Sequence, residues 1–121
     1  MAIKYTVKID DDGTKLYYND KDQLHREDGP AYEGADGTKE WWINGQPHRE
    51  DGPAIEWFDG TKEWFINGKK HREDGPAYED ADGLKEWWIN GEELTEEEFN
   101  NRNRPHVGKT IVLEGVTYTL S

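Results

Sequence analysis

The chain contains no cysteine, which excludes disulfide bonds, thiolate zinc sites and a cysteine nucleophile. Hydrophobic residues make up only 32% of its 121 positions. No apolar run is long enough for a signal peptide or a membrane span, so we expect a cytoplasmic protein. The sequence also has no Gly-rich phosphate loop, no Gly-x-Ser-x-Gly elbow and no His-Glu-x-x-His motif. We therefore expect neither enzyme activity nor a cofactor.

Basic residues are scarce relative to acidic ones. Lys and Arg number 15 against 27 Asp and Glu, which gives a formal net charge of −12. Such a surface repels phosphate backbones and anionic lipids, so we expect no direct nucleic-acid or membrane binding. A partner with a basic surface fits better. The aromatic content of 12% is too high for a disordered tail, and we expect the aromatic side chains to form the core.

An internal repeat organises the sequence. The heptad His-Arg-Glu-Asp-Gly-Pro-Ala begins at residues 25, 48 and 71, so the period is 23 residues. A second repeated stretch, which begins with Asp-Gly and always has the same length, follows each heptad at residues 36–45, 59–68 and 82–91. Residues 12–19 form a partial earlier copy of it. A fixed period in this range is typical of stacked repeat architectures. We divide the chain into an N-terminal capping strand with a partial repeat (1–24), three full repeats (25–93) and a C-terminal cap (94–121).

Each repeat is predicted to be a β-hairpin. Residues 53–57 and 62–66 are rich in β-branched and aromatic residues, which favours strands. Asp59-Gly60 lies between them and Asn67-Gly68 follows, and both dipeptides tolerate the positive φ of tight hairpin turns. Because a lone hairpin is marginal in water, we expect the hairpins to stack. The predicted fold is all-β: an elongated, twisted antiparallel sheet of stacked 23-residue hairpins.

Both ends are predicted to be caps. Apolar and polar residues alternate over residues 3–9, which indicates a strand that pairs with the partial repeat. Thr95 and Glu98 form a capping box and Leu94 and Phe99 a hydrophobic staple, so a short helix is expected there. Residues 109–113 and 116–120 flank Glu114-Gly115 and predict a last hairpin, which we expect to cover the edge of the final repeat.

These two repeated motifs resemble a tandem repeat found in proteins of bacteriophages and giant viruses, and more distantly MORN repeats, which are also stacked hairpins. The ending over residues 90–99 is similar to the usual C-terminal tail of the viral proteins. The resemblance covers about residues 12–100 and implies the stacked-hairpin fold. It also implies a viral source, and hence a location in the cytoplasm of the host cell. Small acidic phage proteins of this kind resemble inhibitors of bacterial defence systems, including anti-CRISPR proteins.

Strand alternation assigns aromatic residues to two faces. Trp41 with Ile43 and Trp64 with Ile66 are predicted to share a core face. We expect the opposite face to carry an aromatic ladder, made of Tyr17, Trp42, Phe65 and Trp88. If it faces solvent, this ladder is a candidate interaction site. The alternative is that the sheet curls, or the caps fold over it, and both faces are core.

Acidic residues concentrate near the last repeat. We define the acidic patch as Asp80, Asp82, Glu86, Glu92, Glu93, Glu96, Glu97 and Glu98. Such a patch is suited to steering a basic protein surface, or to mimicking a phosphate backbone for a DNA-binding target. The alternative is a solvated end of the array with a solubilising role.

The His-Arg-Glu-Asp segments combine histidine with carboxylates, which are the side chains of zinc sites and of acid–base catalysis. Their repetition with the same neighbours argues for a structural role instead. We expect Arg26, Arg49 and Arg72 to pair with acids of adjacent repeats, and Asp-Gly-Pro to form the turn to the next hairpin. We therefore predict no catalytic and no metal-binding residues.

Three functions remain open at this stage. The first is a non-enzymatic interaction protein that binds and inhibits a host protein through the acidic patch and the aromatic ladder. The second is a nucleotide-binding sponge that stacks a base on ladder aromatics with Arg49 or Arg72 near the phosphates. The third is a structural scaffold that assembles into end-to-end or edge-to-edge oligomers. The oligomeric state is left open between monomer and dimer.

Overall fold

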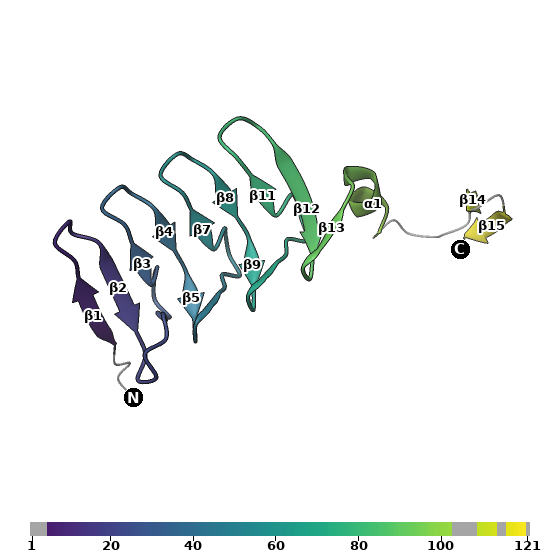
Figure 1. Ribbon diagram of the computed structural model, residues 1–121. Helices are drawn as coiled ribbons and strands as arrows, with labels where there is room; N and C mark the ends of the chain where they lie inside the picture. The colour runs from purple at the N-terminus through teal and green to yellow at the C-terminus, as the bar shows by residue number, and fades with distance from the viewer. Residues whose placement is uncertain (1–4, 103–108, 114–115, 121) are drawn as a thin grey trace.

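The computed structural model describes residues 5–102, 109–113 and 116–120, with side chains described for residues 5–102. Nine strands form one antiparallel sheet in the order β1-β2-β3-β4-β7-β8-β11-β12-β13. They are β1 (Thr6–Ile9), β2 (Lys15–Tyr18), β3 (Tyr32–Glu33), β4 (Lys39–Glu40), β7 (Ile55–Glu56), β8 (Lys62–Glu63), β11 (Tyr78–Glu79), β12 (Lys85–Ile89) and β13 (Glu92–Leu94). Figure 1 shows these strands side by side along one line. The predicted fold of stacked hairpins is confirmed.

Each repeat adds one hairpin to the long sheet and a second, smaller hairpin beside it. The smaller hairpins pair β5 (Trp42–Ile43) with β6 (Gln46–Pro47), and β9 (Phe65–Ile66) with β10 (Lys69–Lys70). In the last repeat, β12 continues unbroken into its pairing with β13. In the first full repeat, Trp41 interrupts the strand between β4 and β5. Its N–H donates to the carbonyl of Ala54 in the next repeat. Neighbouring repeats are therefore joined by backbone hydrogen bonds.

The turns of the smaller hairpins have the backbone conformation that the Asn-Gly dipeptide favours. Asn67 has a φ of 50° and Gly68 a φ of 81°, and the equivalent residues of the other two full repeats have nearly the same values. Positive φ at both central residues is the signature of a type I′ turn, which matches the twist of the flanking strands. The turn prediction from Asn67-Gly68 is therefore confirmed.

A ladder of alternating charge crosses the long sheet. The residues that lie directly opposite one another on successive strands are Lys15, Glu33, Lys39, Glu56, Lys62, Glu79 and Lys85. Opposite charges on facing residues stabilise an antiparallel pair, whereas like charges destabilise it. This ladder therefore favours the observed strand register.

The sheet is a single layer within the described residues, and its core is thin. The buried hydrophobic residues are Ala31, Ala54, Ile55, Ala77 and Phe99. The expectation that the aromatic residues form the core is wrong except for Phe99, because every Trp and Tyr in residues 5–102 is half-buried or exposed. A one-layer sheet has no second layer to exclude water from large side chains on both of its faces.

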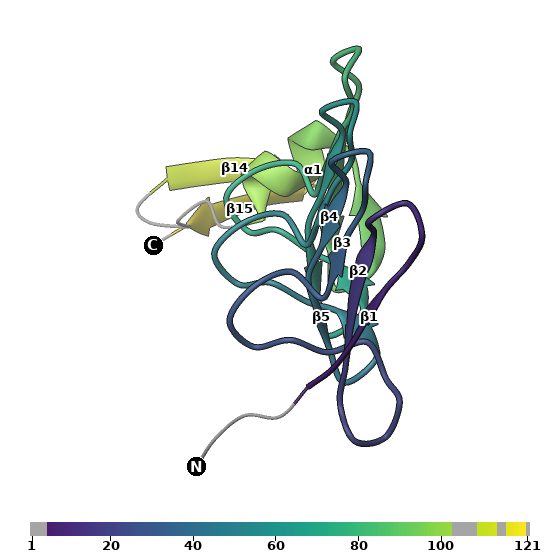
Figure 2. The same cartoon turned by 90° about the vertical axis from the view of Figure 1, so that its left-hand side faces the viewer.

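The two faces of the sheet differ. The face that we call the loop face carries the charge ladder and the His-Arg-Glu-Asp loops, which project to one side in Figure 2. The other face, here called the open face, carries a second row of facing residues: Leu16, Tyr32, Glu40, Ile55, Glu63, Tyr78 and Glu86.

The caps form largely as predicted. β1 pairs with β2, and the helix α1 (Glu96–Asn101) begins after Thr95 with the reciprocal hydrogen bonds of a capping box to Glu98. The last hairpin, β14 (Lys109–Leu113) with β15 (Val116–Leu120), also forms. Its predicted cover over the final repeat depends on residues 103–108, which lie outside the described residues, as do residues 3 and 4 of the first strand. No helix among the described residues has the length and apolar character needed to cross a bilayer.

Candidate functional site

The arginine of each heptad holds its own loop together. Arg49 donates from Nε to Asp51 (3.1 Å), and from its first terminal nitrogen to the carbonyl of Pro53 (3.1 Å) and to Glu56 (3.0 Å). Arg26 and Arg72 make the same contacts in their loops, with longer terminal-nitrogen distances to Glu33 (3.5 Å) and Glu79 (3.7 Å). The prediction that these arginines pair with acids of adjacent repeats is wrong. The Asp-Gly-Pro turn brings acids of the same repeat within reach first.

The same arginines join neighbouring repeats by stacking. The guanidinium carbon lies 4.0 Å from the ring centre of Tyr17 for Arg26, and 3.9 Å from that of Trp64 for Arg72. Arg49 stacks on Trp41 in the same way. Each ring belongs to the preceding repeat, so the guanidinium bridges two repeats while its N–H groups stay within one. Stacking on the ring face is favourable for guanidinium cations.

The histidines have structural hydrogen bonds. Nδ1 of His48 accepts from the backbone N–H of Asn67 at 2.9 Å, while Nε2 faces Glu50 at 3.4 Å. The other two full repeats show the same pattern for His25 and His71. An accepting Nδ1 places the proton of the neutral ring on Nε2. Both nitrogens are therefore engaged, and within residues 5–102 no group of three or more metal-ligating side chains comes together.

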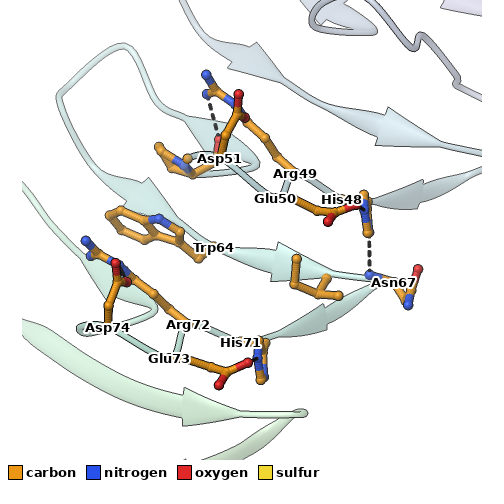
Figure 3. Close-up of a pocket in the computed structure, with 13 residues that line it drawn as sticks. His48, Arg49, Glu50, Asp51, Trp64, Asn67, His71, Arg72, Glu73 and Asp74 are labelled. Carbon is orange, nitrogen blue, oxygen red and sulfur yellow. Dashed lines mark hydrogen bonds and ion pairs between the residues drawn. The ribbon is translucent and has the colours of Figure 1, made fainter.

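Successive loops enclose grooves on the loop face. One groove has a volume of about 920 Å³ and lies between the loops of the second and third full heptads, with Trp64 and Ile66 along its floor. Figure 3 shows Arg49, Glu50 and Asp51 on one side of it and Arg72, Glu73 and Asp74 on the other. A second groove of about 580 Å³ lies one repeat earlier, over Trp41 and Ile43. The two grooves are repeats of one site.

The guanidinium groups in these grooves are poorly placed to bind phosphates. Each already contacts carboxylates of its own loop, and the Arg26 guanidinium holds the pKa of Asp28 below its ordinary value through a hydrogen bond. The groove walls add the carboxylates of Glu50, Asp51 and Glu73. An anionic nucleotide would meet more negative than positive charge there.

The structure divides the predicted aromatic ladder. Trp42, Phe65 and Trp88 are half-buried on the open face, but Tyr17 lies on the loop face beneath Arg26. Its N–H donates to the carbonyl of Ala31, just as that of Trp41 donates to Ala54, so Tyr17 is equivalent to Trp41. Placing Tyr17 in the ladder is therefore wrong by one residue. The Asp-Gly turn sets the register, and aligning residues 12–14 with residues 36–38 would have shown it.

The two indole rings of the ladder each donate a hydrogen bond to a glutamate two residues earlier in the chain. The indole N–H of Trp42 donates to Glu40 at 2.8 Å, and that of Trp88 to Glu86 at 2.9 Å. Lys70 lies over the Trp88 ring at 5.0 Å from its centre. No element among the described residues forms a layer over the open face. The two indoles are therefore oriented by their partners, and all three ladder rings are partly accessible.

The sequence pattern did not single out two solvent-exposed aromatic residues. Trp57 and Phe58 are 39% and 66% exposed, in the turn between β7 and β8. Trp57 donates its indole N–H to Glu63 on the open face, while Phe58 donates its backbone N–H to Thr38 of the preceding repeat. Their position beside Asp59-Gly60 was a usable signal, because residues flanking a turn project beyond the sheet.

Nearby on the open face, desolvation and then the carboxylates of Asp80 and Glu63 raise the pKa of Tyr78.

The acidic patch is not contiguous. Asp80 and Asp82 lie in the turn before β12, whereas Glu92 and Glu93 lie on β13, beyond the other end of β12 (Figure 1). Three patch residues also have structural roles. Asp80 accepts two backbone N–H groups of its turn, Glu86 accepts the indole of Trp88, and Glu98 closes the capping box. The exposed acids that remain together are Glu92, Glu93, Glu96 and Glu97.

Comparison with known proteins gives no match: no family model, no curated protein and no solved structure is similar to this chain.

Proposed function

We propose that this chain is a non-enzymatic protein that binds a host protein with a basic surface, and inhibits it by covering that surface. The open face is the proposed contact area. The main support for this proposal is the half-buried row of Trp42, Phe65 and Trp88, which no second layer covers within the described residues. Aromatic anchors of this kind contribute a large share of the binding energy at protein interfaces.

The charge of the open face supports a basic partner. Carboxylates of Glu40, Glu63 and Glu86 alternate along the sheet with the side chains of Tyr32, Ile55 and Tyr78. The exposed acids at the start of α1 continue this negative surface at the end of the array. Together with the net charge of −12, they favour rapid association with a positively charged surface. Mimicry of a nucleic acid is one form that such recognition takes.

The resemblance of the two repeated motifs to viral repeat proteins supports a host protein as the target. An inhibitor of a bacterial defence protein needs no catalytic site, because occupying the target surface is sufficient. The proposed location is the cytoplasm of the host cell, where such a target is found.

The test is a pull-down from bacterial lysate with the tagged protein at low and high salt, followed by mass spectrometry. The expected result is one enriched basic protein whose retention falls at high salt. The double variant Trp42→Ala/Trp88→Ala should lose at least tenfold in affinity for it, because truncating an interface anchor costs about 2 kcal/mol or more. Circular dichroism must show that the variant keeps the sheet.

Phe58→Ala is the matched control, since Phe58 is exposed but lies outside the ladder. It should bind as well as the original protein. Equal binding by the folded double variant would overturn the open face as the contact area. A salt-insensitive interaction would overturn the basic partner.

A further inference from the structure

The protein fills the two ends of its groove row with its own side chains. At the N-terminal end, Tyr5 lies against the first heptad loop. Its hydroxyl accepts the backbone N–H of Glu27 at 2.9 Å and lies 3.5 Å from the carboxylate of Asp28. Its ring stands at 88° to that of Tyr17, with 5.9 Å between their centres, and lies 6.2 Å from His25. The hydroxyl of one tyrosine thus accepts a backbone N–H, while its ring packs against a second aromatic ring.

The C-terminal end is filled by a different side chain. Arg102 follows α1 and donates to the backbone carbonyl of Glu73 at 2.8 Å, on the third heptad loop. Its guanidinium carbon lies 4.1 Å from the ring centre of Phe99. Tyr5 and Arg102 therefore cover the two outer sides of the loop row, and no side chain of residues 5–102 is inserted into the two internal grooves.

Each internal groove repeats the surroundings of Tyr5. The groove of 580 Å³ presents Trp41, His48, Glu50 and Asp51, at the positions of Tyr17, His25, Glu27 and Asp28. The groove of 920 Å³ presents Trp64, His71, Glu73 and Asp74 one repeat later. The backbone N–H groups of Glu50 and Glu73 have no hydrogen-bond acceptor among residues 5–102, whereas that of Glu27 has Tyr5.

We propose that the two internal grooves bind two tyrosine side chains of one extended, basic segment of a partner protein. The inference goes beyond the proposed function, because these grooves lie on the loop face and not on the open face. Each phenol accepts the N–H of Glu50 or Glu73 and donates to Asp51 or Asp74. Each ring packs edge-on against Trp41 or Trp64, as Tyr5 packs on Tyr17.

The groove rims select for positive charge beside the tyrosines. The side chains of Glu50, Asp51 and Asp74 are 84%, 88% and 87% exposed, and that of Glu73 is 75% exposed. Exposed carboxylates on both rims attract lysine or arginine on either side of an inserted ring. The same rims repel an acidic segment.

The repeat length sets the spacing of the two tyrosines. One repeat adds two strands to the sheet, as β7 and β8 follow β3 and β4. Adjacent strands are about 4.8 Å apart, so equivalent points of the two grooves are roughly 9.6 Å apart. A polyproline II segment rises about 3.1 Å per residue, so tyrosines three residues apart are separated by roughly 9.3 Å on one side. The preferred pattern is Tyr-x-x-Tyr in an extended conformation.

The experiment titrates the full chain, labelled with nitrogen-15, with a lysine-rich peptide that contains two tyrosines three residues apart. Backbone amide signals report the grooves individually. The signals of Glu50 and Glu73 should shift, while that of Glu27 should stay in place because its N–H is already bound to Tyr5. Replacing both peptide tyrosines with phenylalanine should weaken binding at least tenfold, because the phenol oxygen is lost. Moving the second tyrosine by one residue should weaken it similarly.

Three results would overturn the proposal: equal binding of the phenylalanine peptide, equal binding at the altered spacing, or a peptide that leaves the Glu50 and Glu73 signals unmoved. A shift of these signals with protein concentration alone would assign the grooves to a second copy of the chain. The variant Trp42→Ala/Trp88→Ala separates this proposal from the open-face contact. It should keep the peptide affinity, and a tenfold loss in the folded variant would place the peptide on the open face instead.

Discussion

The guanidinium carbon of Arg49 lies 3.8 Å from the ring centre of Trp41, one repeat earlier in the chain. Because its N–H groups contact Asp51, Pro53 and Glu56 in its own repeat, one side chain orders a loop and joins it to the preceding repeat. A sheet without a second layer has few other ways to exclude water from its indole rings. Arginine stacking therefore takes over part of the role of a hydrophobic core.

Replacing this arginine should destabilise the array. Arg49→Ala removes the ring contact and three hydrogen bonds of a side chain that is 23% exposed. We expect a loss of about 2 kcal/mol in the free energy of unfolding, measured by urea denaturation. Arg49→Lys should recover less than half of this, because one ammonium cannot reproduce the planar, multiple contacts. Full recovery by lysine would mean that charge alone matters at this position.

The small buried side chain in each repeat should not tolerate enlargement. Ala54 has no exposed surface beneath its loop. Ala54→Val should lower the free energy of unfolding by about 1–3 kcal/mol, because extra methyl groups in a packed site force the backbone to move. Ala81→Val is the matched control, since Ala81 is exposed. Similar urea midpoints for the two variants would contradict the tight packing at Ala54.

The N-terminus of α1 should depend on its capping box. Thr95→Ala removes the hydroxyl that accepts the N–H of Glu98, and should cost about 1 kcal/mol. Because Phe99 is buried through this helix, we expect hydrogen exchange at residues 96–101 to accelerate first. Glu97→Ala, in the same turn but outside the box, should change exchange by much less. Slow exchange retained in the Thr95 variant would show that the cap is dispensable.

Stability should fall in acid through the turn aspartates. In Asp59, hydrogen bonds from the backbone and side chain of Thr61 lower the pKa below 3.8, and Asp12 is lowered equivalently by Thr14. A carboxylate with a lower pKa in the folded state contributes stability above pH 3.8, and this contribution is lost as the pH falls below it. Thermal unfolding followed from pH 7 to pH 2 should show this loss.

The double variant Asp12→Asn/Asp59→Asn should show a smaller acid dependence, because the amide oxygen still accepts the hydrogen bond but does not titrate. Asp82→Asn, where no backbone N–H is accepted in the described residues, should retain the original dependence. If both sets of variants lose stability equally in acid, these turn carboxylates are not its source.

The repeated pattern made the fold predictable from the sequence. Asn67-Gly68 and the capping box of Thr95 and Glu98 specify local backbone geometry, and local geometry repeated at a fixed period leaves few ways to assemble the strands. The three repeats therefore identified the long antiparallel sheet without any knowledge of distant contacts.

The candidate sites were less predictable because they depend on contacts between repeats. Alternation within one strand cannot show that Trp41 interrupts the hairpin by bonding to Ala54 of the next repeat. Sequence proximity placed Asp82 and Glu92 in one patch, although β12 separates them. The grooves required the loop geometry, which depends on the stacking of Arg49 and Arg72 on neighbouring rings and on backbone hydrogen bonds.

The order of the strands also determines how the molecule would respond to mechanical force. β1 and α1 lie at opposite ends of the row of strands in Figure 1, so tension between them acts along the inter-strand hydrogen bonds. In that direction the bonds break one pair after another, as in a zipper, instead of sharing the load as in shear. The array should therefore yield to weak force in a series of similar steps, each releasing about one repeat.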